Sequence, residues 1–141
     1  LRFNTQTLIL SAVQARFKSS LFDIKQLVQA DLFDSELDAA RELSKNGFHR
    51  AAGAVAGVVL EKHLGQVVAN HAIATKKQHP TISDFNDLLK NGAILDVPAW
   101  RNIQRLGDLR NLCDHSKHRD PTKEEIAELI DGVDKITKTL F

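Results

Sequence analysis

The sequence has a single cysteine, Cys113, and no methionine among its 141 residues. One cysteine excludes an internal disulfide and fits a reducing compartment, so we expect a cytoplasmic protein. Because the chain starts at Leu1 and contains no methionine, we expect it to be one domain, 1–141, cut from a longer polypeptide. A chain of this length is long enough to bury a real hydrophobic core.

An excess of charge of one sign is also lacking. The formal net charge is +1 with neutral histidines, so no overall basic field indicates nucleic acid or a membrane as a partner. Any contact with nucleic acid must therefore depend on a local basic patch. The longest apolar run, Ala51 to Leu60, is about half of the ~20 residues that a membrane-spanning helix needs. We therefore expect no membrane contact.

The sequence shows no strand pattern, no repeated structural unit and no low-complexity segment, and every periodic segment indicates a helix. Apolar residues three and four apart predict a helix from about Asn4 to Ala30. Asp34 or Ser35 is expected to cap a second, short helix that ends at Asn46-Gly47. The apolar stripe of the first helix comprises Ile9, Val13, Phe17, Leu21, Ile24 and Val28.

The segment from Phe48 to His71 is apolar nearly all round in its first half, which predicts a central, buried helix. Small residues along it would let neighbouring helices approach closely: Ala52, Gly53, Ala56 and Gly57.

Three further helices are predicted in the second half of the chain. Thr81 or Ser83 caps a short one, and Pro98 opens the next, which reaches His115. The last follows a capping box formed by Thr122 with Glu125. The sequence thus predicts an all-α, helical bundle of about five or six helices.

A polar stripe on the helix that begins at Pro98 is the candidate site. On a wheel of 100° per residue, one face carries Gln104, Asp108, Asn111 and His115. Arg110 lies at the seam of this face and can form an i,i+4 ion pair with Asp114. Arg110 and His115 point about 140° apart, so they converge poorly within one chain. A two-fold dimer would bring two such pairs to one cleft.

Spacing alone favours a plainer interpretation, a solvated helix end where basic side chains suit the macrodipole. A zinc site would use Asp114, His115 and His118, with His63 as the remaining candidate, but no fourth ligand lies at a suitable spacing. Cys113 falls on the apolar face, which is typical of a small core residue and not of a nucleophile. We therefore expect neither a metal nor another cofactor.

The run "LRNLCDHSKHRDPTKEEIAELIDGVDKI", Leu109 to Ile136, resembles the C-terminal part of HEPN domains. This all-helical family includes metal-independent ribonucleases of toxin–antitoxin, CRISPR and phage-defence systems. Its signature is an arginine, usually followed by a polar residue, and a histidine four to six positions later, which Arg110, Asn111 and His115 match. The segment from Phe48 to Leu64 also looks like the small-residue core helix of the family.

The resemblance implies an HEPN-like bundle and a metal-independent endoribonuclease that works as a homodimer. An RNA 2′-hydroxyl would attack its own 3′-phosphodiester, leaving a 2′,3′-cyclic phosphate and a 5′-hydroxyl. A toxin or phage-defence context, with an antitoxin or another regulatory partner, is implied as well. The implied catalytic residues are Arg110, His115 and Asn111, with Asp108 and Asp114 in support and with Lys117, His118 and Arg119 as the basic patch for the RNA backbone.

One feature departs from HEPN toxins in which a tyrosine two positions after the histidine is modified by the antitoxin. Lys117 stands at that position, and the chain has no tyrosine, so we expect no such control. Two alternatives stay open. One is a noncatalytic HEPN module for dimerisation or nucleotide binding within a larger protein. The other is a plain helical interaction domain whose partner surface is formed by Phe17, Leu21 and Ile24.

Overall fold

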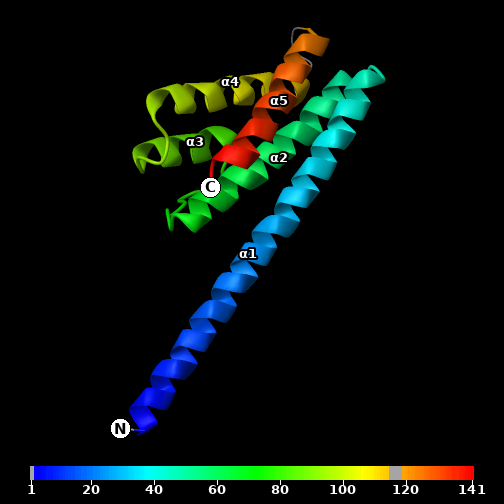
Figure 1. Cartoon of the computed structure of the whole chain (residues 1–141). Coiled ribbons are helices and arrows are strands. Elements are labelled where there is room, and N and C mark those ends of the chain that lie inside the picture. The colour runs from blue at the N-terminus through cyan, green and yellow to red at the C-terminus, as the bar shows by residue number, and fades with distance from the viewer. Residues whose placement is uncertain (1, 115–118) are drawn as a thin grey trace. The chain divides into compact units, whose positions relative to one another are not determined.

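The computed structural model describes residues 2–114 and 119–141, and of residues 2–5 it describes the backbone only. Within these residues it has five helices and no strand (Figure 1). The prediction of an all-α bundle of about five or six helices is therefore confirmed. The helices are α1 (Arg2–Lys45), α2 (His49–Asn70), α3 (Ile82–Asn91), α4 (Val97–Asp114) and α5 (Lys123–Thr139).

The chain divides into two compact units, Leu1–Leu32 and Phe33–Phe141. Unit 1 consists of the N-terminal part of α1. Unit 2 comprises the remainder of α1 together with α2 to α5, and it contains the hydrophobic core. That the whole chain, 1–141, is one domain stays a prediction.

Helix α1 corrects the prediction of two separate helices before Asn46. It runs without interruption from Arg2 to Lys45, so neither Asp34 nor Ser35 caps a new helix. The Asp34 carboxylate instead lies 3.7 Å from the Lys138 ammonium group of α5. No glycine or proline stands near this point to stop the helix, and Phe33 and Leu37, four residues apart, are both buried in the core of unit 2.

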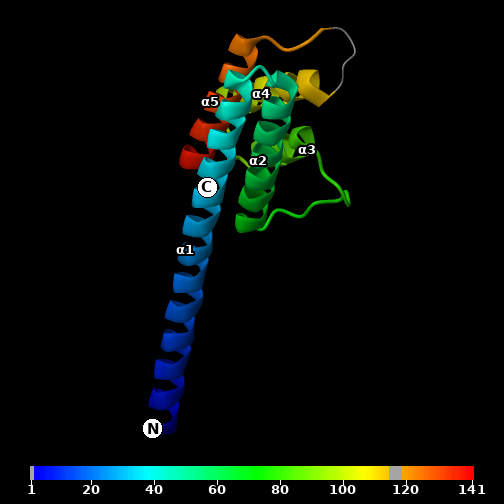
Figure 2. The same ribbon diagram turned by 90° about the vertical axis from the view of Figure 1, so that its right-hand side faces the viewer.

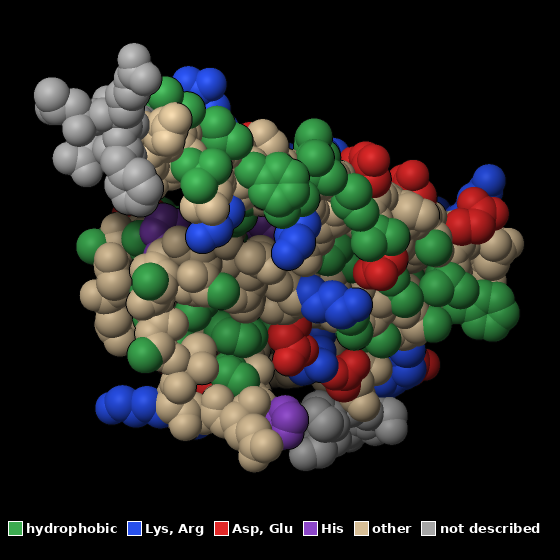
Figure 3. Space-filling view, turned by 90° about the horizontal axis from the view of Figure 1, so that it is seen from below, with side chains coloured by type: hydrophobic (Ala, Val, Ile, Leu, Met, Phe, Trp, Pro, Cys, Tyr) green, Lys and Arg blue, Asp and Glu red, His purple; other side chains and the backbone are tan. Residues whose placement is uncertain are grey.

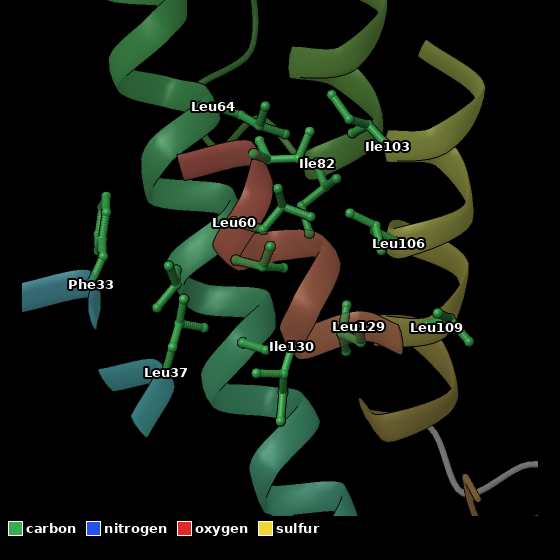
Figure 4. Close-up of a cluster of buried hydrophobic side chains, with 14 of the residues drawn as sticks. Phe33, Leu37, Leu60, Leu64, Ile82, Ile103, Leu106, Leu109, Leu129 and Ile130 are labelled. Atoms are coloured by element: carbon green, nitrogen blue, oxygen red, sulfur yellow. The ribbon is translucent and has the colours of Figure 1, made fainter. Parts of the chain in front are cut away.

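Helix α2 occupies the centre of unit 2, with α3, α4 and α5 packed against it (Figures 1 and 2). This confirms the prediction of a central, buried helix. Figure 4 shows how leucine and isoleucine side chains from these helices meet in one cluster. The fully buried members include Leu37, Leu60, Leu64, Leu89, Ile103, Leu106, Leu109, Ile126, Leu129 and Ile130.

Two glycines of α2 allow α4 to lie directly against its backbone. A Cβ atom at Gly53 would overlap the sulfur of Cys113, and a Cβ atom at Gly57 would overlap Cγ of Arg110. The close approach predicted from the small residues of this helix is thus confirmed. Gly57 thereby sets where the Arg110 side chain can lie.

Side-chain caps fix where three of the helices begin. Thr81 with Asp84 forms a capping box at α3, and the predicted box of Thr122 with Glu125 is confirmed at α5. Helix α4 begins just before the predicted Pro98, where the Asp96 carboxylate accepts a hydrogen bond from Ala99 N. Among the described helices, none combines the length and the apolar character needed to cross a membrane.

Candidate functional site at the C-terminal end of α4

Arg110 reaches across the surface of α2 near the end of α4. Its aliphatic stem lies against Gly57, and the side chain is 28% exposed. The stem is therefore held by packing while the guanidinium group keeps contact with solvent. An arginine in this position can meet an anion without leaving the helix surface.

Two carboxylates flank the Arg110 guanidinium group. Asp114 Oδ2 lies 2.8 Å from Nε, which confirms the i,i+4 ion pair predicted from spacing. The Nε–H bond does not point at this oxygen, so the contact is an ion pair and not a hydrogen bond. Glu61 Oε2, from α2, lies 3.9 Å from Nη2. Two negative charges thus surround one positive charge.

The structure does not join the other predicted α4 residues to Arg110. Asn111 and Asp108 are exposed, and within the described chain no hydrogen bond or ion pair links either of them to Arg110. Asp108 acts elsewhere. The pKa of Arg105 is raised, mainly by its hydrogen bonds to Glu128, and the negative charge of Asp108 makes a smaller contribution.

The remaining predicted residues lie where α4 ends. His115, Lys117 and His118 are outside the described residues. Arg119 is described, and its guanidinium group is directed at Glu125, with Nη2 2.8 Å from Oε2. Hydrogen bonding from Arg119, together with the cap contact to Thr122, lowers the pKa of Glu125 to about 2. Arg119 would have to leave this carboxylate in order to bind a phosphate.

Arg50, at the start of α2, is a residue that the sequence patterns did not single out. Its Nη1 donates hydrogen bonds to the carbonyl oxygens of Leu112 (3.1 Å) and Cys113 (3.3 Å) at the end of α4. Its Nη2 donates to Arg119 O (3.2 Å) and to the Asp120 carboxylate (2.7 Å). One guanidinium group thus fixes the chain on both sides of residues 115–118. No sequence signal marks it, because its partners are mostly backbone carbonyls some 60 to 70 residues away.

His63, considered above as a zinc ligand, is a buried side chain that packs in the interior of unit 2. It is buried in edge-to-face contact with the rings of Phe33 and Phe141. Its Nε2 lies 2.7 Å from the Leu140 carbonyl oxygen, to which it can only donate. Desolvation by burial lowers the pKa of His63, against the opposing effect of these backbone contacts. Within residues 2–114 and 119–141, no group of three or more His, Cys, Asp or Glu side chains is arranged to hold a metal.

Cys113 is buried against α2, as its place on the apolar face predicted. Its thiol donates to the Leu109 carbonyl oxygen (3.4 Å), and burial raises the pKa of Cys113 to about 11. At neutral pH almost none of it is the reactive thiolate. This thiol is therefore a core side chain and not a nucleophile.

No family model, curated protein or solved structure matches this chain. The cluster of Arg110, Asp114 and Glu61 carries a formal charge of −1, from one cation and two anions. The two carboxylates compete with any phosphate group that approaches the guanidinium, and the arginine fork could offer such a phosphate two parallel hydrogen bonds.

Proposed function

We propose that the chain is a HEPN-type endoribonuclease that cleaves RNA without a metal, as a homodimer in the cytoplasm. The observation that carries the proposal is the position of Arg110, which is anchored on Gly57 and remains partly open to solvent. It precedes His115 by five residues in a motif that resembles the signature of the HEPN ribonucleases. A toxin or phage-defence role, with an antitoxin or another regulatory partner, belongs to the same proposal.

In this proposal the RNA supplies its own nucleophile. The 2′-hydroxyl loses its proton and attacks the adjacent phosphorus, and the bond to the 5′-oxygen of the next nucleotide breaks. His115 accepts the proton of the 2′-hydroxyl, and a His115 imidazolium returns a proton to the departing 5′-oxygen, since an unperturbed imidazole has a pKa near 6.5. Arg110 keeps its charge throughout and stabilises the developing negative charge on the non-bridging oxygens. Asn111 orients the phosphate, and the local basic residues Lys117, His118 and Arg119 hold the RNA backbone.

The experiment is an RNA cleavage assay in EDTA with the whole chain and two variants, Arg110→Ala and His115→Ala. We expect cleavage that survives the chelator and that falls about 10²–10⁴-fold in each variant. The products should carry 2′,3′-cyclic phosphates. Arg101→Ala is the matched control because Arg101 is an exposed arginine of the same helix, and it should cleave like the unaltered chain.

Three results would contradict the nuclease proposal: cleavage that needs a divalent metal, cleavage that persists in both variants, or equal loss in Arg101→Ala. A folded dimer that leaves RNA intact would support the second candidate, a noncatalytic module for dimerisation or nucleotide binding. The observation that favours this candidate is the neutralisation of Arg110 by Asp114 and Glu61. Such pairing suits a structural arginine as well as a catalytic one at rest.

A further inference from the structure

Unit 1 presents an apolar face that the proposed nuclease site does not use. Seven large side chains recur along it in steps of three, four and four residues, twice over, which is an eleven-residue repeat. All seven are between 43% and 64% exposed. We call them the seam: Leu10, Val13, Phe17, Leu21, Ile24, Val28 and Leu32. Figure 3 shows hydrophobic side chains lying open among charged ones on the face of the molecule seen from below.

A face of this kind needs a partner. Helices in proteins gain most of their stability by packing an apolar face, and contiguous exposed apolar surface marks sites of interaction. A membrane surface is a poor partner, because helices that lie on membranes carry a polar face rich in lysine and arginine. Here residues 6–32 carry three basic and two acidic side chains, Arg16, Lys18 and Lys25 against Asp23 and Asp31, a net charge of only +1.

We propose that the seam packs against the seam of a second copy of this chain, as a parallel two-helix coiled coil. From Leu10 to Leu32 the seam spans about 33 Å of helix at 1.5 Å per residue. Two helices stay in contact over such a length only if their apolar repeats have the same period, since a mismatch rotates one seam away from the other. A second copy of the chain has the same sequence and therefore the same eleven-residue repeat.

The area of the seam fits a stable dimer. Burying an exposed side chain of this size removes roughly 60–120 Å² of apolar surface from water. Ile9 and Leu27, which are 60% and 68% exposed, flank the seam on one side. The nine side chains together supply about 500–1,000 Å² per chain, a range that includes the ~800 Å² per partner of a standard interface.

Charge selects the parallel orientation. On a helix with an eleven-residue repeat, Lys18 and Lys25 lie along one side of the seam, whereas Arg16, Ser20 and Asp31 lie along the other. Full antiparallel overlap, with Leu10 opposite Leu32, would place Lys18 of each helix beside Lys25 of the other. Parallel pairing instead separates Lys18 from Lys25 and brings Lys25 of one helix to the side of the partner that carries Asp31, with which it can form an ion pair.

The first test measures the mass of the whole chain by analytical ultracentrifugation over a range of concentrations. We expect a dimer for the unaltered chain and a monomer for Phe17→Glu and for Ile24→Glu, because each variant puts a charge into the seam. Phe22→Glu is the matched control. Phe22 is 46% exposed but lies about 130° from the centre of the seam, so this variant should remain dimeric. Circular dichroism confirms that each variant is folded.

Each other outcome overturns the proposal. A monomeric unaltered chain would mean that a different molecule covers the seam. A dimer that survives both Phe17→Glu and Ile24→Glu would mean that the chain pairs elsewhere. Equal dissociation by Phe17→Glu and Phe22→Glu would mean that apolar surface in general, and not the seam, holds the copies together.

The second test checks the orientation by disulfide trapping in a Cys113→Ser background. In a parallel pair, a chain with Val13→Cys should form a covalent dimer with itself under mild oxidation, because equivalent positions face each other within the short Cα separation that a disulfide needs. If Val13→Cys instead forms covalent dimers only when mixed with a Val28→Cys chain, the pairing is antiparallel and the parallel arrangement is refuted.

Discussion

The carboxylates beside Arg110 differ in how strongly they compete for its charge. Asp114 lies 2.8 Å from Nε and belongs to the same helix, whereas Glu61 approaches Nη2 only to 3.9 Å from α2. All three side chains are partly exposed, so water screens both interactions and neither contributes much to the stability of the fold. The two carboxylates matter for ligand binding, because their negative charges compete with a phosphate for Arg110.

Replacing Asp114 with Asn should therefore strengthen RNA binding. Removing one partly exposed ion pair frees up to about 1 kcal/mol of competing interaction, which corresponds to about 2–5-fold tighter binding. The probe is an RNA with 2′-O-methyl groups, which cannot be cleaved because its nucleophile is blocked. Fluorescence anisotropy measures the dissociation constant. Glu61→Gln should have a smaller effect, since its carboxylate lies farther from the guanidinium.

The control for net charge is Asp38→Asn, which removes one negative charge from the exposed carboxylate of Asp38 on α1. If Asp38→Asn strengthens binding as much as Asp114→Asn, the effect is one of overall charge and not of competition at Arg110. Weaker binding by Asp114→Asn would assign Asp114 a role in orienting the arginine toward its ligand.

The sequence predicted the residue-scale contacts that depend on helix periodicity and no others. The pair of Arg110 with Asp114 follows from a spacing of four residues, and the capping box of Thr122 with Glu125 follows from a spacing of three. For α3 the sequence offered Thr81 or Ser83 as the cap, and the structure has Thr81. Glu61 and Arg50 reach their partners across helices, and that depends on how α2 and α4 pack. No local pattern encodes such a contact.

At the scale of the elements, the close approach of α4 to α2 makes Gly53 intolerant of a side chain. Gly53→Ala should destabilise the fold by about 1–3 kcal/mol, because its methyl group would overlap the Cys113 sulfur. This cost exceeds the ~1 kcal/mol that alanine gains over glycine in a helix. Urea unfolding measures the change. Adding Cys113→Ala should recover part of the loss, since it removes the overlapping atom.

Gly107→Ala is the matched control within α4. A methyl group there would meet only Ile82 Cγ2 at 3.5 Å, an ordinary contact. This variant should stabilise the fold by about 0.5–1 kcal/mol through helix propensity alone. If both alanine variants change stability in the same direction, packing between α2 and α4 is not the cause.

The ends of the helices were predictable where the sequence has strong capping or termination signals. The capping box of Thr122 with Glu125 gave the start of α5, and the Asn46-Gly47 pair gave the end of α1. The small residues of α2 indicated its packing. The break predicted near Asp34 was wrong because aspartate and serine are also tolerated on the surface of a continuing helix. The continuous helix is explained by the burial of Phe33 and Leu37 in the core of unit 2, which is a tertiary effect.

At the scale of the whole molecule, the buried His63 links folding to pH. Burial lowers its pKa in the folded chain, so around pH 6.5 the unfolded chain binds a proton more readily than the folded one. Stability is therefore full above this pH, and it is lost as the pH falls from about 6.5 toward the lowered folded value, by at most about 1.4 kcal/mol per pH unit.

We expect the urea midpoint to fall between pH 7 and pH 5, and His63→Gln to reduce this slope even if it lowers stability at pH 7. The titration of acidic groups does not interfere with the urea midpoints between pH 7 and pH 5. Glu125, whose pKa is lowered to about 2, contributes stability that is lost only as the pH falls below about 4.5. A pH slope that is the same in His63→Gln would show that another group titrates.

The hydrogen bonds of Arg50 affect how much the length of the segment between Asp114 and Arg119 can change. Because a single guanidinium holds Leu112 and Cys113 on one side and Arg119 and Asp120 on the other, the two ends are fixed independently of the number of residues that join them. Insertions or deletions between them would alter only that junction and would leave the register of α4 and α5 in the core untouched. Engineered insertions here should leave the bundle folded, while they would move His115, Lys117 and His118 of the proposed nuclease site relative to Arg110.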